Sequence, residues 1–114
     1  MVIDGFIFYN ELKLLDFRFA ELYDYVDKFI LVESTHTFLS EPKELHFLNN
    51  KHRYEKYLDK VVHVVVGPYA SGHSSKSRRR SMRYEFWQRD QIVKTAQRLF
   101  DEDDLLFLSD CDEI

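Results

Sequence analysis

Four short apolar runs, rich in β-branched and aromatic residues, alternate along the chain with segments that have helical periodicity. The runs cover residues 2–8, 29–32, 61–66 and 105–108. Runs of this length and composition are typical of buried strands. Apolar residues three and four positions apart predict amphipathic helices over about 11–26 and about 84–100. This alternation predicts an α/β fold, with a mainly parallel sheet of about four strands flanked by helices.

The segments between these elements carry weaker patterns. Pro42 to Leu58 has partial helical spacing and predicts a short helix or irregular turns. Gly67 to Ser81 is rich in Ser, Gly and Arg, has almost no apolar residue, and is expected to be a loop. Arg18 falls outside the apolar stripe of the first predicted helix, so we assign it to the polar side with the other charged residues of that helix.

An acidic motif, Asp110-Cys111-Asp112-Glu113, follows the fourth apolar run directly and is expected to form its exit loop. In an extended segment Asp110 and Asp112 point to the same side, where two carboxylates repel each other unless a cation lies between them. Mn²⁺ or Mg²⁺ binds one or two protein carboxylates together with the oxygens of a substrate diphosphate. The motif therefore indicates a metal site for Asp110 and Asp112, with a solvated acidic loop as the alternative.

The strand order decides what faces this motif. In the order 3-2-1-4 of nucleotide-binding half-folds, the fourth strand lies beside the first, and ligands bind at the carboxyl ends of the strands. The loop Tyr9-Asn10-Glu11 would then face Asp110 and Asp112 across the crevice.

Two other classes with an apolar strand before acidic residues do not fit. A P-loop nucleotidase requires Gly-x-x-x-x-Gly-Lys-Ser/Thr, and the three glycines, Gly5, Gly67 and Gly72, do not form it. A haloacid-dehalogenase-type phosphatase needs a lysine and a second acidic cluster after its Asp-x-Asp, whereas only Ile114 follows Glu113 in this sequence.

Charge favours neither a nucleic-acid nor a membrane partner, because the formal net charge is −4. One basic segment, Arg78 to Arg83, leaves open a non-catalytic module that binds phosphate or nucleic acid, with a plain solvated loop as the competing interpretation. Cys111 is the only cysteine, which fits a reducing, cytoplasmic environment. The sequence carries neither a signal-peptide pattern nor an apolar run of about 20 residues that would span a membrane.

Several segments, in their order and spacing, resemble one family. Asp4 to Leu15 contains Phe-Ile-Phe-Tyr-Asn-Glu-Leu-Lys-Leu-Leu, and the pattern continues with Arg18 and Glu21-Leu22. Further matching segments are Val26–Ser34, Thr37-Phe38, Lys43, Glu85, Gln88–Gln91 and Asp104–Ile114. The chain resembles glycosyltransferase family 17 along its entire length.

The resemblance implies a GT-A, Rossmann-like half-fold, with residues 1–114 as a single nucleotide-sugar-binding domain that ends after the Asp-x-Asp motif. It implies an inverting transfer of a sugar, N-acetylglucosamine in the family, from a UDP-sugar to a glycan or glycoprotein acceptor. Asp112 would be the main metal ligand, and Asp110 would contact the ribose or the metal. The acceptor site and the general base are expected beyond Ile114.

Five further residues have two possible interpretations each, one as a ligand-binding residue and one as a structural residue. Asn10 and Glu11 could contact the nucleotide base and ribose, or serve as a helix cap and a first-turn carboxylate. Glu33 and Ser34 could bind uridine, or belong to a solvated loop. Arg89 could pair with a donor phosphate or the acidic motif, or form a structural ion pair.

Overall fold

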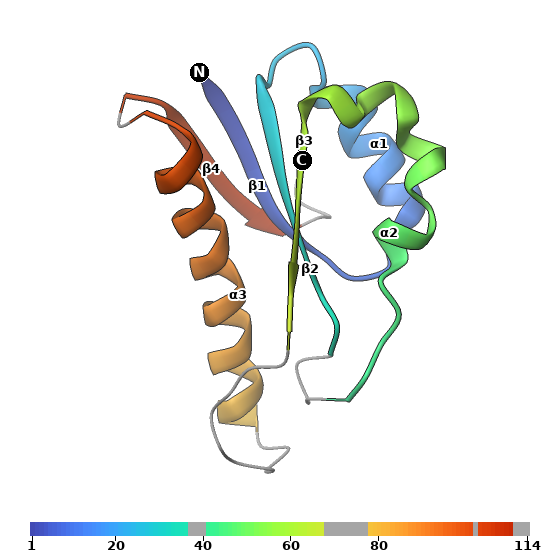
Figure 1. Ribbon diagram of the computed structural model, residues 1–114, viewed down its shortest axis with the longest axis vertical. Helices are drawn as coiled ribbons and strands as arrows, with labels where there is room; N and C mark the ends of the chain where they lie inside the picture. Colours follow the sequence, from blue (N-terminus) through green and yellow to red (C-terminus); the bar gives the residue numbers. More distant parts are fainter. Residues whose placement is uncertain (37–40, 68–77, 102, 111–114) are drawn as a thin grey trace.

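The computed structural model describes residues 1–36, 41–67, 78–101 and 103–110, and the side chains of 78–84 and 110 are not part of the description. The described part folds into one α/β unit (Figure 1). Its elements are β1 (Val2–Phe8), α1 (Leu12–Leu22), β2 (Lys28–Ser34), α2 (His46–Asn49), the 3₁₀ helix η1 (Lys51–Lys60), β3 (Val61–Val66), α3 (Arg78–Leu99) and β4 (Leu105–Asp110).

The sheet has the order β3-β2-β1-β4, and all of its pairs are parallel. The register aligns Gly5 of β1 with Ile30 of β2 on one side and with Leu108 of β4 on the other. The predicted α/β class is confirmed, the strand order is the 3-2-1-4 of nucleotide-binding half-folds, and the sheet with its helices forms a Rossmann-like half-fold.

Helices cover both faces of the sheet: α3 lies on one face, and α1, α2 and η1 lie on the other (Figure 1). Under α1, the core consists of Phe6, Phe8, Leu15, Phe19, Val26, Phe29, Leu31, Phe47 and Tyr54. Under α3, it consists of Ile3, Ile30, Val32, Val66, Ile92 and Ala96. Strands β1 and β2 contribute to both cores, which explains why apolar residues in these strands do not alternate with polar ones.

Several predicted boundaries are wrong. The first helix ends at Leu22, short of the predicted 26, and beyond its end the amides of Tyr25 and Val26 both donate to the Leu22 carbonyl. Strand β2 runs through Ser34, since Ser34 pairs with Val66 of β3. Strand β4 likewise continues to Asp110, so the first residue of the acidic motif is not in an exit loop.

The basic segment also departs from expectation. Helix α3 begins at Arg78, so residues 78–81 are helical and not part of a loop; residues 68–77 lie outside the described part. Arginine is a good helix former, and a Ser- and Arg-rich composition does not by itself exclude a helix. The 42–58 segment is confirmed as short helical structure, in α2 and η1.

A buried ion pair connects β1, α1 and β4. The guanidinium of Arg18 donates to both carboxylate oxygens of Asp4, from Nε at 2.8 Å and from an Nη at 2.6 Å, and the same Nη reaches the Ser109 hydroxyl. Its planar group lies 4.5 Å from the centre of the Phe6 ring. Only 1% of Arg18 and 4% of Asp4 is exposed, so the expectation that Arg18 lies on the polar side of the helix is wrong.

Glycine is required at position 5 by close packing of α3 on the sheet. A Cβ added at Gly5 would lie 2.3 Å from Cγ2 of Ile92, closer than two carbon atoms can approach. The Ile92 methyl is attached to a β-branched carbon inside the core and has little freedom to move away. The absence of a side chain at Gly5 therefore sets how closely α3 approaches β1.

Gly5→Ala is expected to destabilise the protein by about 1–3 kcal/mol through overpacking. The cost should be smaller when Ile92→Ala is present, because that change removes the methyl that the new Cβ would meet. Urea unfolding of the two single variants and the double variant measures this coupling. Equal costs of Gly5→Ala in both backgrounds would refute the packing explanation.

Arg18→Met should destabilise the protein by about 3–5 kcal/mol, because it leaves the Asp4 carboxylate buried without its cation. Adding Asp4→Val should recover part of this loss, since no charge then remains buried. Chemical denaturation of the single and double variants is the measurement. A double variant less stable than Arg18→Met alone would contradict this account of the pair.

Candidate functional site

The carboxyl ends of all four parallel strands lie at one edge of the sheet. Ile7 of β1 pairs with Asp110 of β4, and Phe8 pairs with Glu33 of β2. The structure therefore brings the backbone of Asp110 beside the strand that leads into Tyr9. The side chain of Asp110 and all of Asp112 lie outside the described part, so their geometry is not part of the site as seen here.

The loop after β1 presents its side chains at this edge. Tyr9 is 41% exposed, its ring centre lies 6.4 Å from that of His46, and the Lys43 ammonium lies 5.3 Å from the Tyr9 ring. Asn10 is also exposed. The tyrosine ring and the asparagine amide are thus accessible to a ligand.

Glu11 occupies the N-cap position of α1, but its side chain makes no capping hydrogen bond; its carboxylate accepts from the Tyr9 amide at 3.3 Å. The reading of Asn10 as the helix cap and Glu11 as a first-turn carboxylate is therefore wrong. The proposed contacts of Asn10 and Glu11 with a nucleotide stay predictions.

Glu33 is fully buried at the end of β2 and holds α2 against the sheet. Its carboxylate accepts hydrogen bonds from the amides of Phe47 at 2.6 Å and Leu48 at 3.3 Å, and lies 2.9 Å from Nε2 of His63. The solvated-loop reading of Glu33 and Ser34 is wrong, because 0% and 2% of these residues are exposed. These hydrogen bonds connect the end of β2 to the start of α2, and the contact of Glu33 with a donor stays a prediction.

A narrow pocket of about 20 Å³ opens between the carboxyl ends of β1 and β2. Its lining residues are Ile7, Phe8, Tyr9, Ser34, His36, Lys43 and Gln88. The Ser34 hydroxyl accepts from the His36 amide at 3.1 Å, and Lys43 donates to the Glu44 carbonyl at 2.8 Å. Burial lowers the pKa of the Lys43 ammonium, and the negative charges of Glu33 and Glu11 offset part of that effect.

Sequence reasoning did not assign His36 or Gln88 to the site. Gln88 had a recognisable signal, because it precedes Ile92 by four positions and shares the stripe of α3 that faces the sheet. A polar residue on such a stripe needs a reason to be there. His36 follows β2 in a polar stretch and had no comparable signal.

Arg89 forms the structural ion pair that was one of its two readings. An Nη of Arg89 lies 3.0 Å from Oε1 of Glu85, one helical turn earlier, and both side chains are more than a third exposed. This pair does not prevent a contact with a donor phosphate, which stays a prediction.

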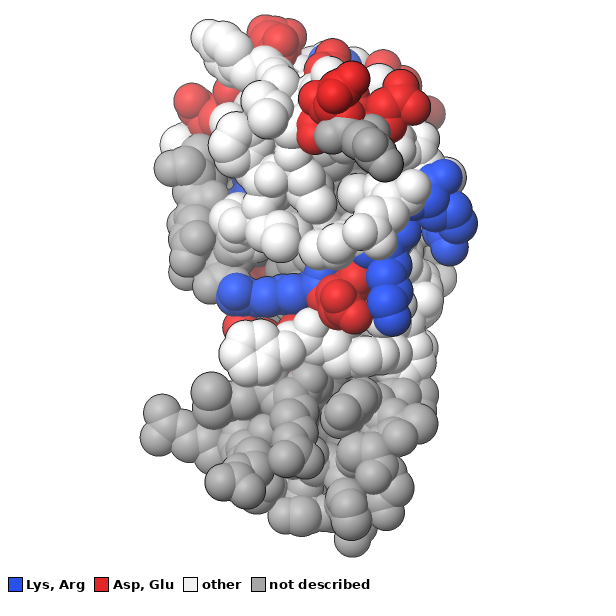
Figure 2. Space-filling model, turned by 90° about the vertical axis from the view of Figure 1, so that its left-hand side faces the viewer, with Lys and Arg blue, Asp and Glu red and all other residues white. Residues whose placement is uncertain are grey.

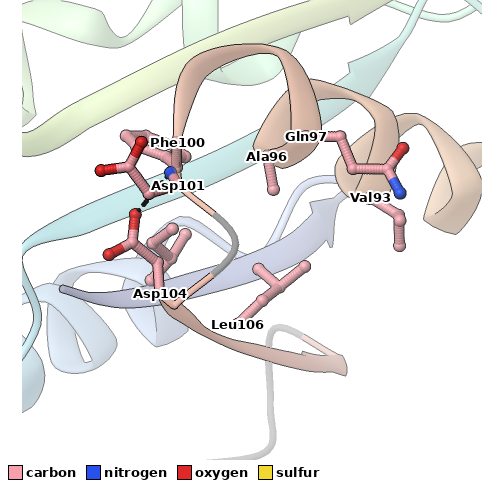
Figure 3. A pocket seen from close by; sticks show the side chains of 8 residues that line it. Val93, Ala96, Gln97, Phe100, Asp101, Asp104 and Leu106 are labelled. Carbon is pink, nitrogen blue, oxygen red and sulfur yellow. Dashed lines mark hydrogen bonds between the residues drawn. The ribbon is translucent and has the colours of Figure 1, made fainter.

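The opposite edge of the sheet has a wider pocket, of about 510 Å³, where β1 and β4 begin (Figure 3). Apolar side chains of α3 and the two strands form its wall, and Asp101 and Asp104 lie at its rim. Asp104 accepts from the Asp101 amide at 2.9 Å and pairs with the Met1 amino group at 3.0 Å. Figure 2 shows acidic side chains gathered at this end of the α3 and β4 face. Because ligands of parallel α/β sheets bind at carboxyl ends, this pocket is not the candidate site.

Metal binding at the acidic motif is untested by these contacts. Among residues 1–36, 41–67, 78–101 and 103–110, no three His, Cys, Asp or Glu side chains gather closely enough to hold a metal ion. Residues 111–114 lie outside this set. The same described residues contain no helix that is long and apolar enough to cross a membrane.

Comparison with known proteins assigns the family. The model of glycosyltransferase family 17 matches residues 1–114. Beta-1,4-mannosyl-glycoprotein 4-beta-N-acetylglucosaminyltransferase is 30% identical to the chain over 123 residues in both Rattus norvegicus and Homo sapiens. The enzyme of the same name from Mus musculus is 29% identical.

These matches cover 99% of the chain but only 21% of each relative, so the chain spans about a fifth of their length. No solved structure matches the chain significantly. Because the family model matches all 114 residues, the chain belongs to glycosyltransferase family 17.

Proposed function

We propose that this chain is the donor-binding part of a metal-dependent glycosyltransferase that transfers N-acetylglucosamine from a UDP-sugar to a glycan, with a GT-A fold. The observation that carries the proposal is the pairing of Ile7 with Asp110. It brings the start of the acidic motif to the sheet edge that also presents Tyr9 and Asn10. The names of the relatives support the sugar and the kind of acceptor.

The base and ribose of the donor would bind at the end of β1. Tyr9 offers an exposed ring on which a base can stack, and Asn10 offers an exposed amide for hydrogen bonds to the ribose. Lys43, whose ammonium lies 5.3 Å from the Tyr9 ring, would add N–H donors beside the base. Asp110 and Asp112 would lie at the diphosphate end of the donor.

The carboxylates of Asp110 and Asp112 suit Mn²⁺ or Mg²⁺, because both cations take oxygen ligands and share them with a diphosphate. When bound, the cation would neutralise charge that builds up on the departing UDP. In the transfer, the bond between the anomeric carbon and the diphosphate oxygen breaks, and its electron pair leaves with UDP. The acceptor hydroxyl forms the new bond on the opposite face and gives its proton to a general base, which no residue of this chain is assigned to provide.

The alternative of a phosphate- or nucleic-acid-binding module at Arg78 to Arg83 has no specific support in the described contacts. The backbone of this segment forms the first turns of α3, and its side chains are outside the description. Such a module predicts binding that weakens steeply with salt and needs no divalent metal.

Titration calorimetry with UDP tests the proposal. The protein should bind UDP when Mn²⁺ is present, and removal of the metal should weaken binding at least tenfold, a loss of about 1.4 kcal/mol. Asp112→Ala should abolish this dependence on metal, because it removes the main proposed ligand.

Two variants serve as controls. Asp103→Ala removes an equal charge from the exposed loop before β4, at the opposite edge of the sheet, and Arg79→Ala alters the basic segment. Both should keep metal-dependent UDP binding nearly unchanged. UDP binding that is absent from the folded protein, or is indifferent to Mn²⁺, would refute the proposal.

A further inference from the structure

The side-chain carbonyl of Gln88 is buried without a hydrogen-bond partner. Gln88 is 2% exposed, and Oε1 is the one buried side-chain polar atom in the described part of the chain that lacks a partner. A buried acceptor that makes no hydrogen bond destabilises a folded protein, so such atoms are few and call for an explanation. A ligand that donates to Oε1 would supply one.

Gln88 lies where a ligand is expected. Although it belongs to α3, it lines the narrow pocket at the carboxyl ends of β1 and β2, together with Tyr9, Ser34 and Lys43. The pocket is at the sheet edge at which parallel α/β folds bind ligands. The residue that carries the unpartnered acceptor is therefore a lining residue of the candidate site.

The size of the pocket restricts what can enter. A volume of about 20 Å³ admits a group about as large as one water molecule, so a ligand can insert an edge but not a ring. The bulk of the ligand would lie outside, over the exposed ring of Tyr9. A planar group that stacks on Tyr9 and directs an N–H inward would meet both restrictions.

We propose that Gln88 determines specificity for the base of the donor: its Oε1 accepts a hydrogen bond from the imide N–H of uracil. This inference rests on the proposed function. Uracil presents an N–H between two carbonyl oxygens, so its donor matches Oε1, and Lys43 retains N–H donors for a neighbouring carbonyl after its bond to Glu44. Cytosine has an acceptor at the same ring position, which would face Oε1 unfavourably.

The test compares UDP with its N3-methyl derivative and with CDP, by calorimetry in the presence of Mn²⁺. The unaltered protein should bind UDP at least tenfold more tightly than either, because a methyl group replaces the imide N–H in the first compound and cytosine has an acceptor at that ring position in the second. Gln88→Met replaces the amide with an apolar side chain of similar size. It should abolish most of the preference and leave thermal stability equal or higher, since it also removes a buried acceptor that lacks a partner.

Gln97→Met is the matched control, because it makes the same change in the same helix at the opposite edge of the sheet. It should keep the preference for UDP. If Gln88→Met does not fold, Gln88→Ala, which only removes atoms, gives the same comparison.

The outcomes distinguish the role of Gln88 from the proposed function of the chain. Equal binding of UDP and N3-methyl-UDP to the unaltered protein, or a preference that survives in the folded Gln88 variant, would overturn the role of Gln88 and leave the proposed function standing. No UDP binding by the unaltered protein would overturn both.

Discussion

Parallel pairing of β4 with β1 is the constraint on which the candidate site depends. It sets the first and last strands of the described chain side by side, so that residues more than a hundred positions apart share one edge. The Arg18 guanidinium strengthens this arrangement, since it bonds to Asp4 of β1 and to Ser109 of β4 from a position on α1. Without that pairing, Tyr9 and the acidic motif would be unrelated segments.

The two edges of the sheet carry different side chains, and this difference indicates which edge binds the ligand. At the amino edge, a wide pocket has apolar walls and a rim whose carboxylate, Asp104, is already paired with Met1 and the Asp101 amide. At the carboxyl edge, a narrower pocket combines an exposed aromatic ring, an ammonium group and the buried acceptor of Gln88. The second combination offers stacking, charge and a directed hydrogen bond, which together suit a nucleotide.

Sequence alone predicts the sheet well, because each strand is a compact apolar run and the alternation with helices leaves few topologies. It fails for Arg18 and Glu33, since charged residues are assigned to solvent by default. Their burial depends on partners distant in sequence: Asp4 for Arg18, and the Phe47 amide and His63 for Glu33. The sequence does contain a sign of the Asp4–Arg18 pair. Asp4 interrupts a strand that is otherwise apolar, and a buried carboxylate needs a cation beside it.

Part of the candidate site can likewise be predicted from the sequence. Tyr9, Asn10 and Asp110 follow from the rule that ligands bind at the carboxyl ends of strands. The start of α3 at Arg78 could not be predicted, because composition distinguishes polar from apolar segments better than helix from loop. Gln88 required the structure, since only packing reveals that its carbonyl oxygen is buried without a partner.

The metal and the nucleotide are proposed to bind together at the carboxyl edge of the sheet. Paramagnetic broadening of backbone amide signals by Mn²⁺, recorded by NMR in the presence of UDP, tests it directly, because the strands are about 20 Å long and the effect falls steeply with distance. Binding at the carboxyl edge should broaden the amide signals of Phe8, Tyr9 and Ser109 and leave those of Asp101 and Asp104 little affected. Broadening centred on Asp101 and Asp104 would place the metal at the other edge and contradict the account.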